Sequence, residues 1–154
     1  VEGLEARVTN TSGASTIQAS LTQNVIHHLI SIQNPYVHNS SINTLQAAVL
    51  DLTVSMQCND PTQVYIYIDQ PLATGLQDFL SQDGKPVTYS TVAGTFSTSA
   101  LPILSFIVGI TGSTTQFDLQ PFRVTVPPGA TLSIGVLSTA SIQQAAAALV
   151  WNCV

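Results

Sequence analysis

The feature that most limits the fold of this chain is a two-residue period of apolar side chains. Successive side chains of a β-strand point to opposite faces, so strict alternation predicts a strand with one buried face. The longest alternating run lies at 45–58, and the side chains predicted to point inward there are Ala48, Leu50, Leu52, Val54, Met56 and Cys58. Shorter runs lie at 4–9, 16–22 and 25–33. The turn signal Asn59-Asp60-Pro61 predicts that 63–69 pairs with 45–58 as a hairpin.

Further strands are predicted at 86–92, 94–99, 101–110, 115–126, 130–138 and 144–153. The stretch 72–82 is the helical candidate, because Leu76, Phe79 and Leu80 have i, i+3, i+4 spacing. Many short strands without alternating helices predict an all-β fold. We expect an antiparallel β-sandwich of jelly-roll type with one short helical turn.

Within these runs, each side chain is assigned to a face. In the run 16–22 the predicted inward residues are Ile17, Ala19 and Leu21. The run 25–33 is predicted to place Ile26, His28, Ile30 and Ile32 on one face. In 63–69, alternation predicts Val64, Ile66 and Ile68 inward and Tyr65, Tyr67 and Asp69 outward.

Charged residues are scarce, with three cationic and eight acidic side chains among 154 residues. None occurs between Arg7 and Asp51, between Lys85 and Asp118, or after Arg123. A surface of Ser, Thr, Gln and Asn costs little to desolvate against a copy of itself, and few ionisable groups predict stability that depends little on pH. So few Lys and Arg argue against nucleic-acid binding. No stretch has the roughly 20 apolar residues of a membrane-spanning helix.

Two cysteines and two sequons point to an oxidising, extracellular setting. The even pair Cys58 and Cys153 predicts a disulfide, worth about 4–5 kcal/mol in the chain-entropy model. The alternative is two buried thiols in a reducing compartment. Asn10 and Asn39 begin N-glycosylation sequons and are expected to carry N-linked glycans if the chain is secreted by a eukaryote or archaeon. We also expect that a leader has been removed ahead of Val1.

No pattern of metal-binding, cofactor-binding or catalytic residues is found. Adjacent histidines in a strand point to opposite faces, so we expect ordinary strand and loop roles for His27, His28 and His38. The aspartates do not have the spacing of a calcium-binding loop, so we expect turn and cap roles for Asp51, Asp69 and Asp78. The sequence contains no Gly-x-Ser-x-Gly elbow. The members of a Ser–His–Asp triad need not be adjacent in the sequence, so residue spacing does not decide whether one forms. Gly109 and Gly112 do not precede a helix, so they indicate a turn. We therefore expect no enzyme.

A sugar-binding platform is the main alternative site. The aromatic residues that could form it are Tyr36, Tyr65, Tyr67, Tyr89 and Trp151, although alternation makes Trp151 a core candidate. Aromatic residues make up only 6% of the chain. A secreted carbohydrate-binding or adhesin domain thus remains open as a second reading, and a jelly-roll coat protein as a third.

The N-terminal segment divides the chain into a strand at 1–12 and a sandwich domain at 13–154. It consists of a short alternating strand and then a polar stretch, 9–16, predicted to be a flexible connector. Two interpretations are open: it is the first strand of its own sandwich, or it adds to the sheet of another subunit. In the second, Leu4, Ala6 and Val8 would fill pockets, and Glu5 and Arg7 would fix the register.

The whole chain resembles the extracellular filament proteins of archaea, the threads and bundling pili. The features shared are the alternating start "VEGLEARVT", a single charge-poor domain rich in Ser, Thr, Gln and Asn, the sequons at Asn10 and Asn39, and the pair Cys58 and Cys153. The resemblance implies a secreted jelly-roll-like subunit, linked to the next copy by its N-terminal strand. The expected function is therefore structural: an extracellular homopolymer for adhesion or biofilm, with no cofactor.

Overall fold

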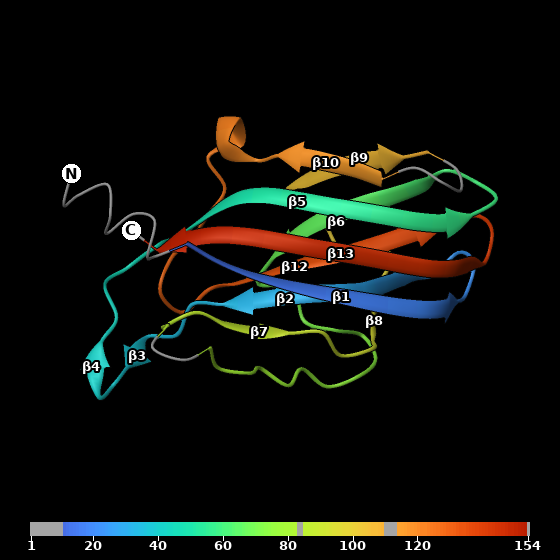
Figure 1. Cartoon of the computed structure of the whole chain (residues 1–154). Helices are drawn as coiled ribbons and strands as arrows, with labels where there is room; N and C mark the ends of the chain where they lie inside the picture. Colours follow the sequence, from blue (N-terminus) through green and yellow to red (C-terminus); the bar gives the residue numbers. More distant parts are fainter. Residues whose placement is uncertain (1–10, 83–84, 110–113, 154) are drawn as a thin grey trace.

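The computed structural model describes residues 11–82, 85–109 and 114–153, and nearly all of its regular structure is β. Two antiparallel sheets stack face to face (Figure 1). Sheet A has the order β1-β13-β5-β10, and β11 also pairs with β5. These strands are β1 (Thr11–Leu21), β5 (Ala47–Cys58), β10 (Thr114–Asp118), β11 (Thr125–Val126) and β13 (Ile142–Cys153).

Sheet B has the order β7-β2-β12-β6-β9, and β8 also pairs with β2. These strands are β2 (Ile26–Gln33), β6 (Thr62–Ile68), β7 (Thr88–Ser90), β8 (Thr95–Phe96), β9 (Leu104–Val108) and β12 (Thr131–Ser138). A small hairpin of β3 (Val37–His38) and β4 (Ser41–Ile42) projects from the end of the sandwich where β13 ends (Figure 1).

The chain changes sheet at most of its long connections, as in a jelly roll. It passes from β1 in sheet A to β2 in sheet B, and the connections β5–β6 and β12–β13 also cross between sheets. The predicted hairpin between 45–58 and 63–69 is therefore wrong, because β6 pairs with β12 and β9 rather than with β5. The Asn59-Asp60-Pro61 turn is used to leave one sheet for the other. The predicted all-β sandwich is confirmed.

The helical turn lies elsewhere than predicted. Residues 72–82 form no helix and instead make isolated bridges at Thr74 and Leu80. A three-residue 3-10 helix, η1 (Gln120–Phe122), contains Pro121, and Arg123 follows it with a left-handed backbone (φ 52°). It interrupts the single strand predicted at 115–126, because proline cannot donate a ladder hydrogen bond.

The core lies between the two sheets and is built from the inward faces of nearly every long strand. Its largest fully buried members include Trp151, Leu52, Met56, Ile66 and Ile134. Among the described residues, the buried members of this core lie between Leu21 and Cys153. Burying side chains of this size stabilises the fold by roughly 1.5–3 kcal/mol each.

Irregular residues shift the alternation in several strands. In β5 the register to β13 skips Leu50, so Val49 is buried and Leu50 faces outward, contrary to prediction. In β1, Ser20 has a positive φ (59°), which leaves Ile17 68% exposed while Leu21 is buried. One extra residue moves every side chain beyond it to the other face, so these predictions failed locally although the strands exist.

A third irregularity, between Ile134 and Gly135 of β12, lies opposite Leu29 in β2. Ile30 and Ile32 belong to the core between the sheets, whereas Ile26 packs in a separate cluster with Tyr67 and Phe96. The predicted common face of β2 is therefore wrong. Tyr67, predicted outward, is fully buried because the connection between β6 and β9 covers the outer face of sheet B.

The prediction of a flexible polar connector at 9–16 is also wrong for the residues that the structure describes. From Thr11 onward these residues belong to β1 and pair with β13, beginning with Thr11 opposite Asn152. Residues 1–10 lie outside the described residues. Thr11 and Ser12, the end of the predicted N-terminal strand 1–12, lie in β1, and the division of the chain after residue 12 stays a prediction.

Candidate assembly surface

The outer face of sheet A carries small, mostly uncharged side chains. A shallow trough of about 210 Å³ crosses it, lined by residues of three neighbouring strands. These include Ser15 and Ile17 of β1, Thr53 and Ser55 of β5, and Ala146 and Ala148 of β13. No described segment is positioned over this face in the way that the β6–β9 connection covers sheet B. A broad face of this kind costs little to desolvate.

The charges of sheet A lie at one edge. Asp118 of β10 stands directly opposite Asp51 of β5, so two carboxylates occupy neighbouring positions on one face. One Asp118 carboxylate oxygen also accepts a hydrogen bond from the Gln120 backbone N–H, at 3.1 Å. Like charges directly opposite each other destabilise a sheet. A cation supplied by a partner would therefore reduce the repulsion between the two carboxylates at this edge.

The outer face of sheet B holds a buried polar network around His28. The bulge opposite Leu29 brings His28 and Ser31 to the same face, with Nε2 2.6 Å from Ser31 Oγ. His28 Nδ1 lies 2.7 Å from the Val92 carbonyl oxygen, which can only accept. Nδ1 therefore carries the proton, and Nε2 accepts from Ser31. Ser31 Oγ also lies 2.7 Å from Ser133 Oγ and accepts from Gln77 Nε2 at 3.1 Å.

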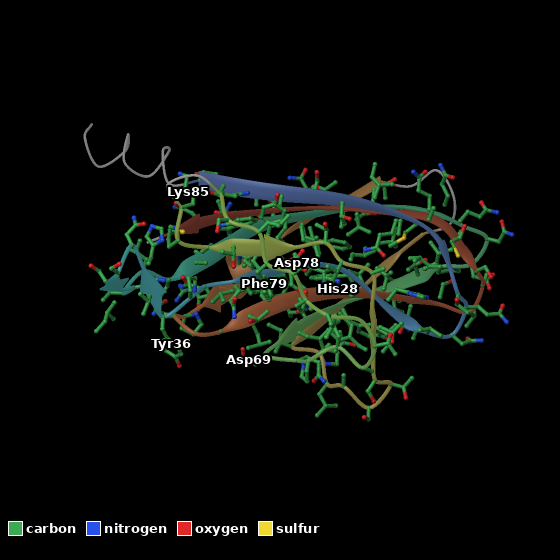
Figure 2. The ribbon with its side chains drawn as sticks, turned by 90° about the horizontal axis from the view of Figure 1, so that it is seen from below. His28, Tyr36, Asp69, Asp78, Phe79 and Lys85 are labelled. Atoms are coloured by element: carbon green, nitrogen blue, oxygen red, sulfur yellow. The ribbon has the colours of Figure 1, made fainter. Side chains whose placement is uncertain are left out.

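This Ser–His contact resembles a nucleophile beside its base, but its surroundings favour a structural role. His28, Ser31 and Ser133 are all 0% exposed, so no substrate reaches the hydroxyl. Burial lowers the pKa of His28 below its ordinary value of 6.5, and the hydrogen bond to Val92 opposes that shift. Figure 2 shows His28 beneath the segment that carries Asp78 and Phe79. The network fastens this covering segment to sheet B. Local sequence patterns contain no signal for it, since it depends on the bulge.

The candidate metal ligands are dispersed. His27 and His28 point to opposite faces of β2, and His38 lies in the projecting hairpin. Asp69 accepts a hydrogen bond from the Thr131 backbone N–H (2.9 Å) in a turn, as expected of a turn residue. Asp78 lies in the covering segment (Figure 2). Within the described ranges no three His, Cys, Asp or Glu side chains form a cluster that could hold a metal ion.

The candidate sugar platform is not assembled. Trp151 and Tyr67 are fully buried, whereas Tyr36 is 70% exposed at the base of the projecting hairpin. Tyr65 lies beside Tyr67, with ring centroids 6.0 Å apart. Tyr89 packs against the main core from β7. The five rings therefore share no exposed face. Gly109 follows β9, and Gly112 lies outside the described residues.

The predicted disulfide between Cys58 and Cys153 is not formed. Cys58 pairs with the start of β13, opposite Ile142, whereas Cys153 ends β13 opposite Ala47. A strand of this length separates them by roughly 35 Å, far beyond the Cα separation that a disulfide allows. Cys58 Sγ instead lies 3.2 Å from Ser138 Oγ. Burial raises the pKa of the Cys153 thiol, and Lys85 opposes that shift.

Of the two sequons, the structure describes one. Asn39 lies at the exposed tip of the β3–β4 hairpin, where it and Ser40 have positive φ angles of 51° and 63°. Asparagine tolerates this left-handed turn better than most residues. Asn10 and the strand-forming residues Leu4, Glu5, Ala6, Arg7 and Val8 lie outside the described residues, so their roles remain predictions.

Two groups of exposed apolar residues were not predicted. One surrounds β9 and η1 and contains Leu101, Ile103, Ile107 and Phe122, which are 49–85% exposed. The other lies on and beside the β3–β4 hairpin and contains Tyr36, Val37 and Ile42. The apolar run 101–110 is visible in the sequence, but a run without alternation does not reveal which of its residues face solvent.

No family model and no curated protein matches the sequence. Among solved structures, the chain is similar to a Bacillus endospore appendage subunit, from appendages described as disulfide-linked pili. The two are 10% identical, over 92% of this chain and 86% of that one, with a TM-score of 0.38. It is also similar to a broad bean stain virus chain (9% identical, 90% and 84% covered, TM-score 0.34). A mud crab dicistrovirus chain is 10% identical, over 97% and 70%, with a TM-score of 0.29.

No helix in the described ranges is long and apolar enough to cross a membrane.

Proposed function

We propose that this chain is the structural subunit of an extracellular filament, in which the N-terminal strand of one copy adds to a sheet of the next. The observation that carries the proposal is the alternating pattern at 4–9, which lies ahead of β1, the first strand of the described sandwich, beginning at Thr11. Strand addition supplies affinity through backbone hydrogen bonds and register through alternate side chains.

The surface supports the same function. Both sheets end in edge strands, and β1 has no charged residue along its whole length. Natural proteins usually protect edge strands with lysine or other charges, because unpaired edges recruit further strands. The uncharged face of sheet A adds a surface that associates at little cost. A fibre built from such contacts contains few titrating groups, which suits an exposed extracellular location.

The test is electron microscopy of the full-length protein, with boiled and unboiled samples compared on SDS gels. Strand-linked polymers should appear as uniform filaments, with a ladder of bands that collapses on boiling. The double variant Leu4→Asp, Val8→Asp should abolish both the filaments and the ladder of bands, because a charged side chain cannot enter an apolar pocket without a large desolvation cost. Thr9→Ala is the matched control and should assemble normally.

Closed shells in place of filaments would favour a coat protein, and particles that stay monomeric without boiling would overturn the proposal. If the double variant still forms filaments, assembly does not use the N-terminal strand. Circular dichroism of each variant checks that the sandwich itself has folded.

A further inference from the structure

The two sides of the sandwich differ in how well their edges are covered. On the side of β1, the connection between β6 and β9 lies against the strand. Gln82 Nε2 donates to the Gly13 carbonyl oxygen at 2.8 Å, and Gln18 Nε2 donates to the Thr91 carbonyl oxygen at 3.4 Å. The opposite side is formed by β9 and β10 (Figure 1), and among the described strands each of these pairs with one neighbour.

The β9 edge is apolar and carries no charge. Ile107 in β9 is 69% exposed, Ile103 just before it is 49% exposed, and Leu101 is 85% exposed. The sequence has no charged residue between Lys85 and Asp118, so this edge lacks the lysines that normally discourage pairing. An exposed, uncharged, apolar edge strand is the surface on which strand addition is expected.

A pocket of about 350 Å³ adjoins this edge. It is lined by Ile103, Leu104, Phe122, Arg123, Val124 and Thr125. Behind it, Phe106 stacks on Phe117, with ring centroids 4.1 Å apart, and meets Phe122 edge-on at 6.2 Å. These rings close the space between the sheets. An added strand would therefore lie along β9 and place side chains in the pocket, without entering the main core.

We propose that the β9 edge and its adjoining pocket accept residues 3–9 of a second copy of this chain. The inference rests on the proposed filament and names its acceptor. Seven extended residues span roughly 23 Å and the five residues of β9 span roughly 17 Å, so the segment is long enough to cover β9 and reach the adjoining pocket. Leu4, Ala6 and Val8 share one face of the added strand, as required for packing against Leu104 and the Phe122 ring.

The added segment also carries an acid and a base two residues apart, Glu5 and Arg7. They alternate with Leu4, Ala6 and Val8, so they lie on the face of the added strand that points away from the pocket. On that face they would fix the register of the added strand without being buried.

Cross-linking tests this acceptor directly. Glu5→Cys, on the face of the added strand that points away from the pocket, is combined with Ser105→Cys on the exposed face of β9 or, as the matched control, with Ser15→Cys on β1. Both serines are exposed and lie in edge strands at opposite sides of the sandwich. Assembled filaments are treated with a short bis-maleimide and run on denaturing gels. The β9 pair should give a boiling-resistant ladder, whereas the β1 pair and each single variant should give monomers. Wild-type filaments control for the buried native thiols.

Other outcomes separate this inference from the filament itself. Filaments that form normally but cross-link only through Ser15→Cys, or through neither pair, would leave the filament intact and overturn the β9 acceptor. A cross-link confined to single chains would mean that the segment folds onto its own subunit, which also overturns it. If wild-type protein forms no filaments, the proposed function fails first, and the acceptor with it.

Discussion

Cys58 and Cys153 occupy opposite ends of the same pair of strands, so two cysteines that look like a disulfide in the sequence are held apart by the fold. Cys58 is opposite Ile142, and Cys153 is opposite Ala47. We predict that the unfolded, unreduced monomer alkylates at both positions. The native protein should react slowly, because Cys58 is 0% and Cys153 is 4% exposed.

Mass spectrometry after alkylation, with and without prior reduction, measures this. A chain that gains both labels only after reduction would contradict the strand register. Reductant should also leave the melting temperature of the monomer unchanged, since no bridge constrains the unfolded state.

Stability should fall on mild acidification because of His28. Its pKa is lowered in the folded state by burial, whereas in the unfolded chain it takes up a proton near pH 6.5. Its contribution is therefore fully present above pH ~6.5 and is lost as the pH falls from there to the lower folded pKa. The limiting slope is about 1.4 kcal/mol per pH unit. This dependence of stability on pH is steeper than the small number of ionisable groups in the chain suggests.

Denaturant unfolding between about pH 8 and about pH 5 checks the slope. His28→Gln should flatten the curve, at the cost of lower stability near neutral pH, and His27→Gln controls for the loss of a neighbouring imidazole. An unchanged slope in His28→Gln would show that other groups are responsible.

Gly135 should not tolerate a methyl group. A Cβ at this position would lie 3.0 Å from Ile26 Cγ2 and 3.1 Å from Phe96 Cδ2, in the cluster that covers sheet B. We expect Gly135→Ala to destabilise the fold by about 1–3 kcal/mol, as overpacking does.

A double-mutant cycle with Phe96→Leu distinguishes this crowding from a backbone effect. If the ring is responsible, the double variant should be more stable than the sum of the single changes predicts. Strict additivity would point to the backbone instead.

Removing one carboxylate from the facing pair Asp51 and Asp118 should stabilise the monomer. Asp118→Asn keeps an oxygen that can accept from the Gln120 N–H and removes the repulsion across β5 and β10. The gain should be roughly 0.2–1 kcal/mol at low salt and should shrink as salt is added.

The control is Asp60→Asn, which makes the same charge change at the β5–β6 turn, where Asp60 accepts from Thr139 Oγ1 at 2.8 Å. A similar gain in both variants would mean that net charge, rather than the facing pair, is responsible.

Asn39 should be modified if the chain is made in a host that attaches N-glycans. It lies at an exposed hairpin tip, and its sequon ends at Ser41. Ser41→Ala should remove the added mass, whereas Ser40→Ala should not. Intact-mass measurement decides, and an unmodified wild-type Asn39 in such a host would refute the prediction.

The class of the fold follows from local sequence patterns. Period-two alternation is a local property, so β5, β6, β12 and β13 could be placed from their own residues. The predicted strands 115–126 and 130–138 likewise left a break before β12. The scarcity of charge can also be read directly from the residues, and it indicates a surface suited to contact with other copies.

Tertiary structure decided which strands pair and which way their side chains face beyond each irregularity. Leu50 and Leu29 look like ordinary members of an alternating run, yet the register slips at both, and each slip reverses a face. The partners that reveal such a slip lie far away in the chain. The separation of Cys58 from Cys153, the His28–Ser31 contact and the exposed β9 edge could not be predicted from the sequence for the same reason. Each depends on residues that only the folded sheets bring together.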